Sequence, residues 1–244
     1  MSDPNISSFI WSIADDVLRD VYVRGKYRDV ILPMTVIRRL DAVLEPTKDA
    51  VLGMKEQLDA ASITNQDRAL RQASGEAFYN TSPFRLRDLT SRGRRQQLRA
   101  DFEVYLDGFS PNVQEVLERF KFRNQIATLV EADALGFLLE KFLDSSIKLS
   151  PRPVLNEDGS VRLEGLDNHG MGTACEELIR RFNEETTKRL GSTSRTGDLC
   201  HQQFPNDAFG YWKDGFILDN MDDGSDDTSQ PREKEPERES EVTP

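Results

Sequence analysis

The stretch DVILPMTVIRRLDAVLEPTK, residues 29–48, decides the fold predicted for this chain. Its apolar side chains recur at the spacing of one helix face; they are Val30, Met34, Ile37, Leu40, Val43 and Leu44. The pattern predicts a helix over residues 29–45, with Pro33 in the first turn, where its missing N–H has no partner within the helix anyway. Pro46 ends this helix, and Thr47 is placed to cap another.

The same helical pattern extends to both sides of this stretch. Upstream, an apolar stripe begins after Ser7 or Ser8, either of which can serve as N-cap; it consists of Phe9, Ile10, Ile13, Val17 and Leu18. Downstream, helices are expected after Thr47 and at about residues 65–78, 94–108, 113–120, 124–131 and 135–145. No segment alternates with period two over the length of a strand, and no repeat has a fixed period. The fold class expected is mainly α, a compact helical bundle.

A different composition begins at residue 149. The stretch LSPRPVLNEDGSVRLEGLDNHGMG predicts a linker that contains a small hairpin around residues 156–159. We interpret GMG, residues 170–172, as a loop and His169 as a turn residue before one further helix that begins at Gly172 or Thr173. The predicted organisation is a helical domain over residues 1–148, a linker and helix over 149–190, and an irregular to disordered acidic tail over 191–244.

Charge is distributed unevenly along the 244 residues. The net charge is −11, and residues 214–244 hold eleven Asp and Glu against three Lys and Arg. The rest of the chain is therefore nearly neutral, so net charge neither favours nor excludes nucleic acid. No apolar run approaches the ~20 residues that span a bilayer, and the N-terminus lacks a basic signal-peptide region. We expect a cytoplasmic protein whose two cysteines, Cys175 and Cys200, are free thiols.

Motifs for catalysis or metal binding are missing from the sequence. The two histidines, His169 and His201, lie far apart and fit no zinc-type spacing. Walker, Rossmann and Gly-x-Ser-x-Gly patterns do not occur. From the residues alone we therefore expect no catalytic, cofactor-binding or metal-binding side chain.

Arginine is concentrated in PFRLRDLTSRGRRQQLRADF, residues 83–102. Guanidinium groups pair well with phosphates, and such clusters bind DNA in a salt-dependent way. The candidate DNA or partner contacts are Arg85, Arg87, Arg92, Arg94, Arg95 and Arg99. The alternative is a solvated loop followed by the exposed face of a helix.

Two adjacent arginines, Arg38 and Arg39, are further candidates for DNA or partner contact. They lie on the helix predicted over residues 29–45. The alternative is that they pair with nearby acids such as Asp41 and Glu45.

The block FIWSIADDVLRDVYVRGKYRDVILPMTVIRRLDAVLEPTKDAV, residues 9–51, resembles the N-terminal helical domain of the modification subunit of type I restriction–modification systems. A second block, GLDNHGMGTACEELIRRFNEE, is similar to the segment that joins this domain to the catalytic domain. The resemblance implies an adenine-specific DNA methyltransferase that uses S-adenosylmethionine. It also implies DNA, the specificity subunit and the restriction subunit as partners.

The resemblance supplies no catalytic or cofactor residue. The family's Asn-Pro-Pro-Tyr/Phe motif holds the flipped adenine, and this sequence contains no Asn-Pro-Pro. We therefore expect a chain without the S-adenosylmethionine domain that does not methylate DNA alone. Residues 191–195 can encode Glu-His-Phe-Thr in a shifted frame, which suggests a frameshift. Three interpretations stay open: a truncated modification subunit, a stand-alone module that binds the specificity subunit, and a non-functional remnant.

Overall fold

A computed structural model describes residues 4–90, 95–144, 149–156 and 158–189 of the chain. These residues form helices and one small hairpin, as expected for a mainly α fold. The helices are α1 (Pro4–Leu18), η1 (Arg24–Lys26, a 3₁₀ turn), α2 (Arg28–Leu44), α3 (Lys48–Ala60), α4 (Asp67–Ser74), α5 (Leu86–Leu89), α6 (Arg95–Asp107), α7 (Pro111–Arg119), α8 (Arg123–Glu131), α9 (Ala134–Phe142) and α10 (Asn168–Arg189). The strands are β1 (Val154–Leu155) and β2 (Val161–Leu163).

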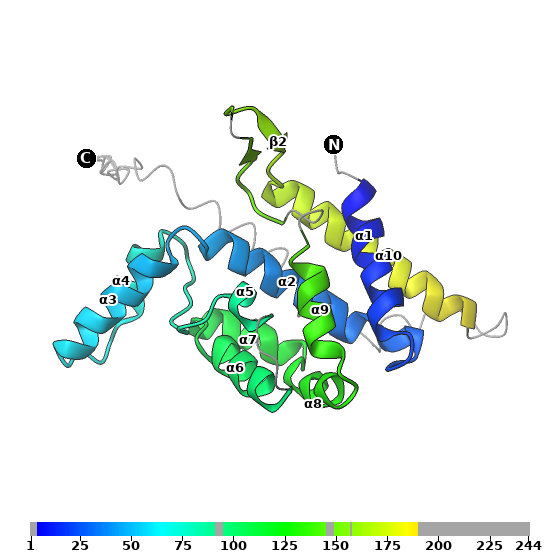
Figure 1. Ribbon diagram of the computed structural model, residues 1–244, viewed down its shortest axis with the longest axis horizontal. Helices are drawn as coiled ribbons and strands as arrows, with labels where there is room; N and C mark the ends of the chain where they lie inside the picture. The colour runs from blue at the N-terminus through cyan, green and yellow to red at the C-terminus, as the bar shows by residue number, and fades with distance from the viewer. Residues whose placement is uncertain (1–3, 91–94, 145–148, 157, 190–244) are drawn as a thin grey trace, which may run out of the picture.

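Helix α2 is the centre of the fold. It is covered on nearly every side, including by α1, α9 and α10 (Figure 1). A helix buried all round needs apolar residues beyond a single stripe, and Ile31, Leu32 and Val36 supply them. Pro33 lies inside α2 and not in its first turn, because the helix already begins at Arg28. The proline therefore removes one internal hydrogen bond from the central helix.

The main hydrophobic core is formed by residues from α1, α2 and the helices α5 to α10. Aromatic rings fill its centre. The ring centroid of Phe102 lies 6.2 Å from that of Phe122, in an edge-on arrangement, and 6.4 Å from that of Tyr105. Tyr105 in turn meets the edge of Phe109 at 5.3 Å. Such pairs add about 0.5–1.5 kcal/mol each beyond burial, and the Phe102–Phe122 pair holds α6 against the N-terminal end of α8.

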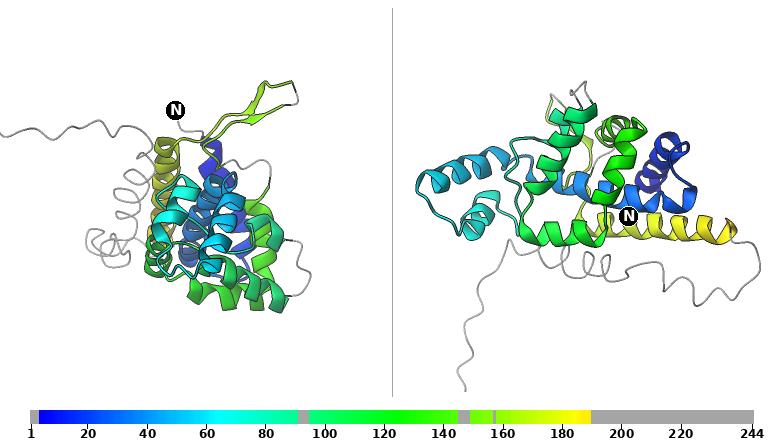
Figure 2. Two further views of the ribbon diagram at one scale, coloured as in Figure 1. Left: turned by 90° about the vertical axis from the view of Figure 1, so that its left-hand side faces the viewer. Right: turned by 90° about the horizontal axis from the view of Figure 1, so that it is seen from below.

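Helices α3 and α4 form an arm that projects from the body (Figures 1 and 2). The two helices pack mainly against each other around a small separate cluster of Val51, Leu70 and Tyr79. Gly75 ends α4 in the left-handed conformation, with φ of 70°, as expected for a helix C-terminus. The arm returns to the body at residues 77–82, where Asn80 bridges to Phe109.

The hairpin expected in the linker is present, with β1 and β2 antiparallel. It projects away from the helices (Figures 1 and 2). Helix α10 begins at Asn168, several residues before the expected start, so GMG and His169 lie inside this helix and the loop interpretation was wrong. Helix α1 likewise begins at Pro4, which places Ser7 within the helix. The tail predicted for residues 191–244 lies outside the described residues.

Candidate nucleic-acid interface

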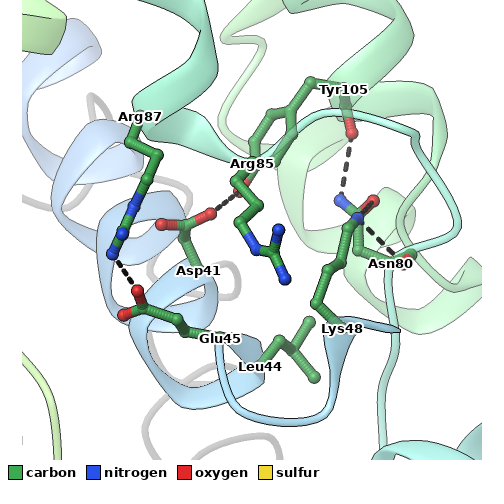
Figure 3. A pocket seen from close by; sticks show the side chains of 8 residues that line it. All are labelled: Asp41, Leu44, Glu45, Lys48, Asn80, Arg85, Arg87 and Tyr105. Carbon is green, nitrogen blue, oxygen red and sulfur yellow. Dashed lines mark hydrogen bonds and ion pairs between the residues drawn. The ribbon is translucent and has the colours of Figure 1, made fainter. Parts of the chain in front are cut away.

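A polar pocket lies where the α3–α4 arm meets the body (Figure 3). It faces solvent, and the space inside it is enough for about one water molecule. The chain segments that form it come from α2, α3, the 80–85 loop, α5 and α6. Its lining side chains are Asp41, Leu44, Glu45, Lys48, Asn80, Arg85, Arg87 and Tyr105.

Asp41 organises the inner side of this pocket. Its Oδ1 accepts hydrogen bonds from the Tyr105 hydroxyl at 3.0 Å and from the Leu86 backbone N–H at 3.1 Å. Its Oδ2 lies 3.6 Å from Arg38 Nη1. Burial, followed by the nearby Asp41 carboxylate, raises the pKa of Tyr105 well above its ordinary value. Tyr105 is therefore a fixed, neutral donor, and Asp41 joins α2, α5 and α6 at one point.

Arg85 and Arg87 lie at the rim of the pocket. Arg85 Nη2 is 2.8 Å from Asp49 Oδ1, and Arg87 pairs with Glu45. The Arg85 backbone N–H donates to Asp88 Oδ2 at 2.8 Å, which fixes the start of α5. The Arg87 side chain is 62% exposed and that of Asp49 is 81% exposed. The two arginines are therefore held in place by pairs that solvent can reach.

Lys48 is the buried cation of the pocket. Lys48 is only 4% exposed. Its Nζ donates to Asn80 O at 3.1 Å and to Asn80 Oδ1 at 2.9 Å (Figure 3). Burial lowers the pKa of Lys48 to about 8, and the Asp41 carboxylate opposes this shift. The side chain is therefore mostly charged at neutral pH and close to its titration range.

The lowered pKa of Lys48 makes stability depend on pH in a defined direction. Above pH 8 the folded chain releases the Lys48 proton, whereas the unfolded chain keeps it up to the ordinary value of 10.5. Stability therefore rises with pH across this window. Relative to Lys48→Met, the wild-type chain is expected to gain up to ~3 kcal/mol between pH 7 and pH 10.

Urea unfolding of both chains at several pH values measures this difference. Tyr105 and Cys175, whose pKa values burial raises, are present in both chains, so their contributions cancel. A difference that stays constant or falls with pH would contradict the environment assigned to Lys48.

Arg38 and Arg39 point into the protein. Arg38 pairs with Asp41, as one of the two sequence interpretations expected, and its Nε donates to Phe142 O at 3.2 Å. Arg39 is 0% exposed. Its Nη1 donates to Leu149 O and to Leu166 O, both at 2.7 Å.

Arg39 Nη2 also donates to Asn168 Oδ1 at 2.8 Å. Burial lowers the pKa of Arg39 to about 10, so it stays charged at neutral pH. Its bonds go to backbone carbonyls and an amide, and not to the nearby acids that the sequence suggested. Because protein covers Arg39, it is not part of the solvent-facing rim that Arg85 and Arg87 form.

The other candidate arginines divide into two groups. Arg99 lies on α6, is partly exposed and pairs with Glu103 at 2.9 Å. Arg92 and Arg94 lie outside the described residues, and of Arg95 the structure describes the backbone within α6 but not the side chain. Among the arginines expected as contacts, the pocket thus brings together Arg85 and Arg87. It adds Lys48, which no motif in the sequence singles out.

Three further features that the sequence analysis considered can be located in the described residues. Within them, no three His, Cys, Asp or Glu side chains come together as metal ligands, and no helix combines the length and hydropathy needed to cross a bilayer. Cys175 is a free, buried thiol whose pKa burial raises to about 12. Cys200 and His201 lie outside the described part.

The fold is thus a helical domain, and its pocket, lined by both cations and acids, lies where the α3–α4 arm meets the body. A family model described as the HsdM N-terminal domain matches residues 6–142, which is more than half of the chain. The chain therefore belongs to this family, the N-terminal domain of the methyltransferase subunit of type I restriction–modification systems. The matched range contains α2 to α9 in full and every residue of the pocket.

Comparison with curated proteins gave no match, and comparison with solved structures gave none either.

Proposed function

We propose that this domain contacts the DNA backbone within a type I complex, through Arg85 and Arg87, with Arg99 as a further contact on α6. The observation that carries the proposal is the rim of the pocket, where both arginines pair with acids that solvent can reach. Arginine forks match phosphate oxygens in geometry and charge. Membership of a type I restriction–modification family supports the proposal, because such systems act on DNA.

The existing ion pairs do not oppose this role. Exposed pairs contribute about 0–1 kcal/mol, so a phosphate can replace Asp49 or Glu45 at small cost. The release of counterions from DNA favours this exchange at low salt. Arg99 offers the same exchange, because its partner Glu103 is also partly exposed.

Methyl transfer is not part of the proposed function of these 244 residues. In the family that the chain resembles, the adenine-binding motif is Asn-Pro-Pro-Tyr/Phe, and the sequence contains no Asn-Pro-Pro. S-adenosylmethionine would be the cofactor of the methyltransferase subunit as a whole. Incubation of the chain with labelled S-adenosylmethionine and adenine-containing duplex is expected to leave the DNA unlabelled; incorporated label would contradict this part of the proposal.

DNA binding by the full 244-residue chain is tested by fluorescence anisotropy with a labelled duplex. We expect non-specific binding, with a Kd on the order of 10⁻⁵ M at ~50 mM salt, that weakens steeply towards ~200 mM. Sequence preference is not expected, because phosphate contacts carry no base information. Undetectable binding at low salt, or binding that salt does not weaken, would remove the DNA role.

A second proposed function is docking to the specificity subunit through the β1–β2 hairpin. Leu155 and Val161 lie opposite each other in its register and are 54% and 48% exposed. Contact with a partner would remove these two apolar side chains from water, which is favourable. Co-purification of the wild-type chain with the specificity subunit in the absence of DNA, and its loss in Leu155→Ser, would favour this function. Equal co-purification of the wild-type chain and Leu155→Ser would exclude the hairpin as the contact surface.

A further inference from the structure

Lys48 has no carboxylate partner at ion-pair distance among the described residues. Its two hydrogen bonds go to the carbonyl and the side-chain amide oxygen of Asn80, both of which are neutral. An ammonium group has three donors, so one N–H remains for a third partner. Burial of a cation without a paired carboxylate is unfavourable. The nearby Asp41, Asp88 and Asp49 carboxylates offset part of this cost, and an anion at the pocket would offset more of it.

Helix α3 strengthens the positive potential at this point. Lys48 is its first residue, where the partial charge of a helix is already positive. Thr47 precedes it but makes no side-chain capping bond, and its hydroxyl donates instead to Leu44 O at 3.4 Å. The Lys48 ammonium group and the N-terminal end of α3 therefore both make the electrostatic potential at the pocket more positive.

The acids around Lys48 fall into two groups. Asp41 is committed to Tyr105, Leu86 and Arg38 inside the fold. Asp88 accepts the backbone N–H of Arg85 and so belongs to the start of α5.

The other two acids lie at the rim. Asp49 is 81% exposed and Glu45 is 41% exposed, and each pairs with one rim arginine. An incoming anion can therefore replace the two rim acids without disturbing the two inner ones. Once these pairs open, the three cations Lys48, Arg85 and Arg87 line the pocket beside the single inner carboxylate of Asp41.

We infer that the open mouth of the pocket is a seat for one phosphate group, held between Lys48 Nζ and the Arg85 guanidinium with Arg87 at the rim. The inference rests on the proposed function, because a DNA backbone phosphate is the intended occupant. Lysine supplies a point charge and arginine a planar fork, a combination suited to phosphate oxygens. Opening of the Arg85–Asp49 pair frees the Arg85 guanidinium, which already lines the pocket, for the phosphate. Free phosphate shares the same chemistry.

The first test uses inorganic phosphate and the full chain at pH 7. The midpoint of thermal unfolding is compared in sodium phosphate and in sodium chloride at equal ionic strength. Lys48→Met removes the charge at the pocket floor, whereas Lys55→Met removes an exposed charge from the same helix as a matched control. General exclusion of phosphate from protein surfaces affects all chains alike, so only the difference between variants counts.

We expect phosphate to raise the midpoint more in the wild-type chain and in Lys55→Met than in Lys48→Met. The affinity for phosphate should fall about tenfold or more in Lys48→Met, since a charge-assisted hydrogen bond is lost. Asp49→Asn, which leaves the pocket floor intact, should bind phosphate more tightly than wild type. Equal effects in Lys48→Met and Lys55→Met would overturn the inference, as would an unchanged affinity in Asp49→Asn.

The second test distinguishes the two sources of phosphate. A short DNA duplex is added to the phosphate-bound chain, and phosphate binding is followed by ³¹P line width. Displacement of phosphate by the duplex supports a backbone phosphate as occupant, whereas phosphate binding unaffected by duplex supports a site for free phosphate only. Duplex binding that Lys48→Met leaves unchanged would remove the inference while the proposed function stands.

Discussion

Replacing Arg39 with methionine is expected to lower the free energy of unfolding by about 3–5 kcal/mol. The guanidinium is fully buried and donates to Leu149 O, Leu166 O and Asn168 Oδ1. Methionine fills similar volume but donates nothing, so it leaves two carbonyls and an amide oxygen buried without these bonds. Each unsatisfied group costs about 1–3 kcal/mol.

The effect of Arg39→Met should be concentrated at the linker. Leu149 and Leu166 lie on either side of the hairpin, and the backbone of Leu166 also donates to Ser150 O at 2.9 Å. Arg39 thus ties both ends of the hairpin segment, and the start of α10, to the central helix α2. Its loss should make residues 149–168 accessible to protease before the rest of the chain unfolds.

Urea unfolding and limited proteolysis measure these two effects. Arg68→Met, an exchange at an exposed position on α4, is the matched control and should change stability by about 0.5 kcal/mol or less. A loss below about 1 kcal/mol for Arg39→Met, or proteolysis that begins elsewhere, would show that Arg39 does not hold the linker.

Replacing Asp41 with alanine is expected to cost about 2–4 kcal/mol. The Tyr105 hydroxyl, the Leu86 N–H and the Arg38 guanidinium would lose their common acceptor. Asp41→Asn keeps an oxygen for Tyr105 and Leu86 but loses the charge opposite Arg38, so it should cost less than alanine. We therefore expect the free energy of unfolding to fall in the order wild type, Asp41→Asn, Asp41→Ala.

A double-mutant cycle of Asp41→Asn with Tyr105→Phe separates the hydrogen bond from general damage. We expect a coupling free energy of about 1 kcal/mol, because the two groups are in direct contact. Independent, additive losses would show that Asp41 does not act through Tyr105. DNA affinity should fall in Asp41→Ala as well, since α5 and its arginines would lose their anchor on α2.

Local patterns were sufficient to predict most of the helices. The apolar spacing in residues 29–45 identified the central helix, and the short helices α6 to α9 lie within a few residues of their predicted places. Helix α5 was missed because its four residues are too few to show a period. The start of α10 was missed because Gly170 and Gly172, typical loop residues, are held inside a helix by packing of Met171 in the core.

The pocket could be predicted only in part. The arginine-rich stretch pointed to Arg85 and Arg87, and the spacing of Arg38 and Asp41 pointed to their ion pair. The role of Lys48 could not be inferred, because its partner Asn80 lies 32 residues away. The bond between Asp41 and Tyr105 spans 64 residues, and no local pattern carries such a contact.

The central claim is that Arg85 and Arg87 contact DNA phosphates. The most direct test is the salt dependence of duplex affinity, from ~50 to ~200 mM salt, for the full chain and for Arg85→Gln/Arg87→Gln. Arg119→Gln/Lys121→Gln removes two charges outside the pocket, at and just beyond the end of α7, as a control. We expect the slope of log K against log salt to fall by about 1.8 in the first double variant and to stay unchanged in the second. Equal slopes in all three chains would contradict the assignment of this pocket as the DNA contact.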